Sequence, residues 1–161
     1  MIRLWWRKAK PRLHYKEEFV ARFVKDYLTT NGIEYTSAAD GAFLVPYETT
    51  LVTIRVASIP VGDGNLMTII RLWALVAVEV PASPQLYRYI ALSNEDFLFG
   101  GLAAAEERSL TKVYFNYSIL AEHLDEAEFG NAIAVVAKTA DSLDETVTHS
   151  FGGRRALDFM E

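Results

Sequence analysis

The sequence predicts an α+β fold in which a mostly antiparallel sheet packs against helices. One observation is the segment from Glu126 to about His149, where apolar residues recur at alternating spacings of four and three, as on one stripe of a helix. A second is the pair of β-branched runs at Leu51 to Ile59 and Leu66 to Val80, bounded by Gly, Pro and Asp. The chain has 161 residues, of which 51% are hydrophobic, so one domain with a full core is expected.

The first expected element is a helix from Tyr15 to Thr30. Its apolar residues fill one face and its charged residues the other, and the pair Asn31-Gly32 tolerates the left-handed backbone at which a helix ends. A short strand over Ile33 to Ser37 follows. Asp40-Gly41 then predicts a turn into a second strand over Ala42 to Pro46.

The two long runs predict the next hairpin, with a turn at Asp63-Gly64-Asn65. Successive residues of a strand face opposite sides, so Leu66 to Val80 has one all-aliphatic side, which is expected to face the core. Its other side joins a charge to a tryptophan. The aliphatic side consists of Ile70, Leu72, Ala74, Val76 and Val78, and the other side of Arg71, Trp73, Leu75 and Ala77.

The next predicted elements are a short helix and a strand pair. Ser83 can cap the helix with Pro84 at its first position, and Asn94 at its end is expected to satisfy backbone groups rather than hold a ligand. Strands are expected over Phe97 to Ala104 and Leu110 to Tyr117, joined by a charged turn.

The final helix is the best specified element. Asp125 can cap its first turn, Glu128 can reach back to that cap, and Gly152-Gly153 provides the stop. Its apolar stripe is expected to cover one face of the sheet. The stripe consists of Phe129, Ile133, Val136, Ala140, Leu143 and Val147. The predicted order is therefore helix, four strands, helix, two strands, helix.

Charged residues are distributed unevenly along the chain. The first 16 residues contain six basic residues and no acidic one, which leaves ten basic against 21 acidic residues, about −11, in the remainder. An acidic body repels nucleic acid and anionic lipid, so no nucleic-acid partner is expected.

We divide the chain into a basic aromatic tail (1–14), one domain (15–153) and a C-terminal tail (154–161). The N-terminal tail contains Trp5 and Trp6, which either contact a partner or fold back on the domain.

The composition of the chain indicates the cellular compartment in which the protein is expected to occur. The chain has no cysteine, which excludes disulfides, thiolate metal sites and cysteine nucleophiles and fits a reducing cytoplasm. The longest apolar run, Leu66 to Val80, contains Arg71 and Glu79 and is shorter than the roughly 20 residues of a membrane helix. Met1 to Trp6 is too brief for a secretory signal. We therefore expect a cytoplasmic protein without a membrane span.

No group of reactive side chains is evident in the sequence. There are three histidines, and none of them has metal-ligand spacing to another. His123 precedes Asp125, Glu126 and Glu128, but acidic residues at a helix N-terminus are expected because they complement its dipole. No nucleophile elbow, calcium loop or phosphate loop is present. We expect no catalysis, no metal and no cofactor.

Several segments resemble one known family. They are Tyr89 to Asn94, Leu98-Phe99-Gly100, Leu102, Val113 to Tyr117, Leu120, Ala140-Asp141, Leu143-Asp144-Glu145 and the ending Phe151-Gly152-Gly153. Together with the element order, they are similar to the YbjN and type III secretion chaperone-like domains of bacteria, and the ending is similar to actinobacterial members. This resemblance covers Tyr15 to about Gly153. It implies a non-enzymatic module that binds peptide segments of a partner protein, often as a homodimer.

Three functions stay open at this point: a peptide-binding chaperone-like module, a regulatory or scaffold protein on the same fold, and an enzyme with an unrecognised site. We expect the first. The predicted binding surface is the sheet face away from the final helix, near Arg55, Arg71 and Trp73, with part of the first helix. Arginine beside tryptophan is enriched at protein contacts. Trp5 and Trp6 are further candidates, and the alternative for Trp73 is cover by the first helix or the tail.

Overall fold

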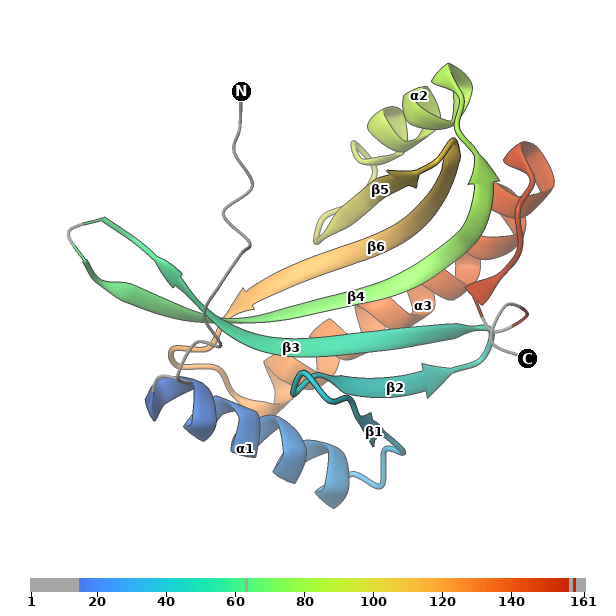
Figure 1. The fold of residues 1–161 in the computed structure, drawn as a ribbon. Helices are drawn as coiled ribbons and strands as arrows, with labels where there is room; N and C mark the ends of the chain where they lie inside the picture. The colour runs from blue at the N-terminus through green and yellow to red at the C-terminus, as the bar shows by residue number, and fades with distance from the viewer. Residues whose placement is uncertain (1–14, 63, 157, 159–161) are drawn as a thin grey trace.

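A computed structural model describes residues 15–62, 64–156 and 158 of the chain (Figure 1). It contains the elements in the predicted order. They are α1 (Tyr15–Thr30), β1 (Thr36–Ser37), β2 (Phe43–Tyr47), β3 (Thr50–Pro60), β4 (Leu66–Pro81), α2 (Pro84–Ser93), β5 (Gly101–Glu107), β6 (Leu110–Leu120) and α3 (Glu126–Phe151). The six strands form one antiparallel sheet with the order β1-β2-β3-β4-β6-β5.

The helices bury their apolar faces on one side of this sheet. The α3 stripe lies against β4, behind the sheet in Figure 1, and its residues Phe129, Val136 and Ala140 are fully buried. α1 lies on the same side, because the rings of Phe23 and Tyr27 contact the Phe129 ring at centroid distances of 5.6 and 5.0 Å. α2 contributes Leu86 and Ile90 to the same core. The predicted cover of one sheet face by the final helix is confirmed.

The other face of the sheet carries no helix of the described part of the chain and is turned to the viewer in Figure 1. The predicted alternation on β4 holds from Ile70 to Val76. Ile70, Leu72 and Ala74 are completely buried, whereas Arg71 is exposed and Trp73 is half-buried. The sheet therefore has one face in the core and one open face.

The alternation ends at two irregularities in β4. The register with β6 shifts between Leu75 and Ala77 and again between Ala77 and Val80. Bulges of this kind bend a strand, and β4 curves strongly in Figure 1. Ala77, which was expected beside Trp73, is instead fully buried. Val78 pairs with Arg154, whose N–H donates to the Val78 carbonyl at 2.9 Å.

The bounds of three strands differ from the prediction by three residues or more, and β6 continues to Leu120 instead of ending at Tyr117. β1 is limited to Thr36–Ser37, and the strand expected over Phe97 to Ala104 begins at Gly101 and ends at Glu107. At Gly100 the backbone has a φ of 71°, and a Cβ there would lie 2.5 Å from the Asn116 carbonyl oxygen. The chain thus turns at Gly100, and Phe97 packs on the core from a loop.

The hairpin turn between β5 and β6 is also shorter than predicted. It consists of Arg108 and Ser109, both with positive φ, as in the two-residue turns that suit a twisted hairpin.

The predicted helix caps are confirmed. The Leu86 N–H donates to Oγ of Ser83 at 3.2 Å, and the Glu128 N–H donates to Oδ1 of Asp125 at 2.7 Å. The side chain of Asn94 bonds to both backbone groups of Leu102: its Nδ2 donates to the carbonyl at 3.1 Å, and its Oδ1 accepts from the N–H at 2.7 Å. The structural role expected for Asn94 is therefore confirmed.

One polar residue lies in the buried stripe of α3. Asp144 is 2% exposed, whereas Leu143, which was expected there, is only partly buried. The hydroxyl oxygen of Thr49, in the turn between β2 and β3, lies within hydrogen-bond distance of the carboxylates of Asp144 and Asp141, and the Thr49 N–H donates to Asp141 at 3.1 Å. These bonds tie α3 to the β2–β3 turn.

Candidate functional site

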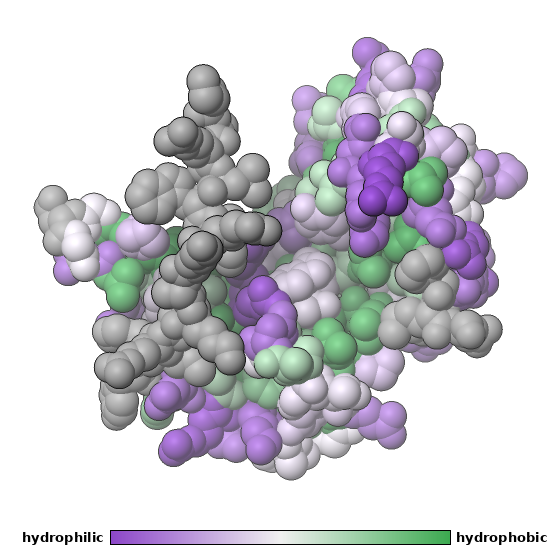
Figure 2. Space-filling view, in the orientation of Figure 1, coloured by the Kyte–Doolittle hydropathy of each residue, from purple (hydrophilic) through white to green (hydrophobic). Residues whose placement is uncertain are grey.

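A hollow of about 380 Å³ lies on the open face of the sheet. Strands β3, β4, β5 and β6 supply its lining, and we call it the sheet groove. Its residues are Arg55, Arg71, Leu72, Trp73, Leu75, Ala105, Lys112, Tyr114 and Asn116. On the described part of the face turned to the viewer in Figure 2, hydrophilic and hydrophobic side chains lie next to one another.

Strand pairing explains how residues distant in sequence meet in the sheet groove. Arg55 on β3 stands directly opposite Arg71 on β4, while Trp73 stands opposite Asn116 on β6. Leu75 stands opposite Tyr114. The three residues predicted from β3 and β4, Arg55, Arg71 and Trp73, therefore line one groove.

Arg55 connects the aromatic and the charged parts of the sheet groove. Its Cζ lies 5.7 Å from the centroid of the Trp73 ring, within the range of a cation–π contact. Its guanidinium also forms an ion pair with Asp40, in the turn before β2. Its Nε is buried and has no hydrogen-bond partner among the described residues. One donor in the wall of the groove is thus left unsatisfied.

The structure corrects one part of the predicted surface. α1 lies on the core side of the sheet, through contacts of Phe23 and Tyr27 with Phe129, so it neither belongs to the open face nor covers Trp73. Trp5 and Trp6 lie outside the described residues, and their role stays a prediction.

Sequence reasoning missed the groove residues of β6. Lys112, Tyr114 and Asn116 occupy every second position of that strand and therefore share one face. Their common spacing was a usable signal. What the sequence lacked was the pairing of β6 with β4, which places them beside Trp73 and Leu75.

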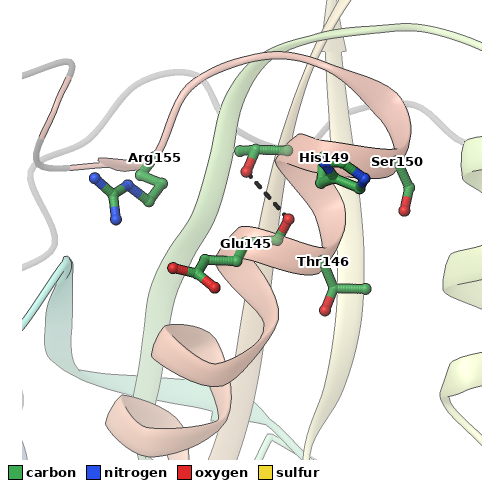
Figure 3. Close-up of a pocket in the computed structure, with 6 residues that line it drawn as sticks. Glu145, Thr146, His149, Ser150 and Arg155 are labelled. Carbon is green, nitrogen blue, oxygen red and sulfur yellow. Dashed lines mark hydrogen bonds between the residues drawn. The ribbon is translucent and has the colours of Figure 1, made fainter.

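A second hollow, of about 730 Å³, lies between the last turns of α3 and the segment that follows it (Figure 3). Its side chains come mostly from one helix and spread apart. Among the described groups no hydrogen bond joins Ser150 to His149, so this region does not assemble a nucleophile with a base. Arg155 lines the hollow from the C-terminal segment, and its hydrogen bond to Asp158 raises the pKa of its guanidinium.

The described residues contain no group of three His, Asp or Glu side chains able to hold a metal ion. Within the same ranges, no helix has the length and hydropathy to cross a membrane. In the candidate cluster near His123, Asp125 acts as the cap of α3.

The family assignment follows from the sequence across nearly the whole fold. Residues 16–159 match the family described as T3SS (YopN, CesT) and YbjN peptide-binding chaperone 1. This chain belongs to that family. It is a chaperone-like protein that binds peptide segments of a partner protein, as the resemblance implied.

Solved structures share the fold of this chaperone-like protein. The crystal structure of YbjN from E. coli matches with a TM-score of 0.61 and 12% identity, over 81% of this chain and 93% of YbjN. A chain of the ExsC–ExsE complex matches with a TM-score of 0.60 and 16% identity, over 81% of this chain and 95% of its own length. No curated protein sequence matches significantly. The type III secretion chaperone-like fold is therefore confirmed, whereas the homodimer and the cytoplasmic location stay predictions.

Proposed function

We propose that the sheet groove is the surface on which this chaperone-like protein binds an extended segment of its partner, and that the protein catalyses no reaction. One observation carries the proposal: aromatic, aliphatic and cationic side chains gather in one hollow on the sheet face that the described helices leave open.

The chemistry of the lining fits a contact surface. Trp73 and Tyr114 offer large amphipathic rings, and Leu75 adds aliphatic area between them. Side chains of this kind dominate binding energies at protein interfaces, and Trp, Tyr and Arg are the residues most enriched there.

The lining gives little support to a catalytic role. Arginine stays protonated, and asparagine, tryptophan and leucine do not exchange protons near neutral pH. General acid–base catalysis needs a group whose pKa is near the working pH, most often His, Asp or Glu. None of these three residue types lines the sheet groove, and of the less common proton-transferring residue types it contains Lys112 and Tyr114.

A random peptide-display library selected on the wild-type protein tests this proposal. The selected peptides should lose about tenfold or more in affinity for Trp73→Ala, because truncation of a central aromatic contact costs about 2 kcal/mol or more. Leu98→Ala is the matched control, since Leu98 is 91% exposed in the loop before β5 and outside the groove. Peptides that bind Trp73→Ala as tightly as wild type would place the binding surface elsewhere.

A further inference from the structure

On the basis of the proposed function, we infer that the sheet groove selects an acidic segment. The ligand is an extended peptide with two carboxylates about six residues apart and apolar side chains between them. This inference concerns the class of segment and deepens the proposal that the groove binds a partner.

The first argument is the charge of the groove. Arg55, Arg71 and Lys112 line it, and no acidic residue does. The whole chain nevertheless carries a net charge of −5. A concentration of positive charge in a hollow of an acidic protein favours anionic ligands and repels cationic ones.

The second argument is that this charge is poorly compensated. Arg55 and Arg71 stand directly opposite each other on adjacent strands, an arrangement in which like charges destabilise a sheet. Asp40 pairs with Arg55, but no ion pair of the described residues involves Arg71 or Lys112. A carboxylate between the two arginines would offset their repulsion.

The third argument is the spacing of the cations. Arg71 stands opposite Ser118 of β6, and Lys112 is six residues earlier on β6. At about 3.3 Å per residue, the two positions are separated by about 20 Å along the strand. Trp73, Leu75 and Tyr114 lie between them. The groove is therefore positive toward both ends and apolar in its middle.

An extended ligand fits this pattern in one register. Side chains at positions 1, 3, 5 and 7 of a strand point to the same side, and six residues span about 20 Å. Acidic residues at positions 1 and 7 would meet the two ends, while apolar residues at positions 3 and 5 would meet the aromatic middle.

Three synthetic peptides test the inference by fluorescence anisotropy. The first has the sequence Asp-Thr-Leu-Thr-Leu-Thr-Asp with both termini blocked, and the others replace both Asp by Asn or by Lys. The acidic peptide should bind about tenfold more tightly than the Asn peptide at low salt, and the Lys peptide should bind most weakly. The preference should shrink as salt is raised.

Charge-reversal variants of the protein test which residues cause the preference for the acidic peptide. Arg71→Glu and Lys112→Glu should each abolish the preference for the acidic peptide over the Asn peptide. Lys138→Glu makes the same change at an exposed position of α3, on the other side of the sheet, and should leave the preference intact. Circular dichroism of each variant verifies that it is folded.

The outcomes separate this inference from the proposed function. Equal binding of the acidic and Asn peptides, with loss of both in Trp73→Ala, would overturn the charge preference and leave the groove as the binding surface. If none of the three synthetic peptides binds but library-selected peptides still require Trp73, the inference of an acidic ligand is overturned and the proposed function stands. Binding of the acidic peptide that is unaffected by Trp73→Ala would overturn both.

Discussion

Replacement of Phe129 by alanine should weaken the packing of α1 against the rest of the core. Phe129 is fully buried on α3, and its ring contacts both aromatic rings that α1 places in the core, those of Phe23 and Tyr27. Truncation of a buried phenylalanine costs about 3–5 kcal/mol. Loss of two aromatic contacts, each worth about 0.5–1.5 kcal/mol beyond buried area, places this substitution near the upper end of that range.

The assay is equilibrium unfolding by heat and by urea, with hydrogen exchange of the α1 amides as a local readout. For a chain of this size, each kcal/mol lowers the melting temperature by about 2–4 °C, so Phe129→Ala should melt about 10–15 °C below wild type. Exchange should accelerate in α1 more than in β4. Phe19→Ala is the control, because Phe19 is 66% exposed on the same helix. A fall of only 2–3 °C for Phe129→Ala would refute the packing argument.

Two further measurements address the N-terminal segment and the dependence of stability on pH. Removal of Met1 to Lys10 should leave the melting temperature nearly unchanged, as for an interaction arm; a fall of more than about 5 °C would instead mean that Trp5 and Trp6 belong to the core. The hydrogen bond from Tyr87 to Glu106 raises the pKa of the phenol, so its small stabilising effect is present below the ordinary tyrosine pKa of about 10 and is lost as the pH rises further. The stability difference between wild type and Tyr87→Phe should therefore shrink above about pH 10 in urea titrations, and a difference that grows there would contradict this reasoning.

The element order was predictable because each element is specified locally. The bounds of α1 agree with the predicted Tyr15 to Thr30, since a charged face and a Gly stop are both local features. The caps Ser83 and Asp125 were likewise readable, because a cap depends only on residues within one turn. The core side of β4 followed from simple alternation.

What the sequence did not show depends on contacts between distant segments. Nothing near Asp144 indicates that it is buried in place of Leu143, because its partner Thr49 is 95 residues away. The irregular part of β4 depends in the same way on Arg154, which pairs with Val78. Three of the nine lining residues were predicted, because Arg71 and Trp73 share one strand and Arg55 lies on the strand that precedes it. Tyr114 joins them only through the pairing of β6 with β4.

The two hydrogen bonds between Asn94 and Leu102 have a consequence for solubility. β5 is an outermost strand, and the outer edge of a sheet can template pairing with a strand of another molecule. The amide of Asn94 occupies both the donor and the acceptor that Leu102 would offer to such a strand. At the opposite margin, β1 is only two residues long and offers little edge to pair with. The outer edge of β5 is thus blocked at Leu102, and β1 is too short to be a good template for edge-to-edge aggregation.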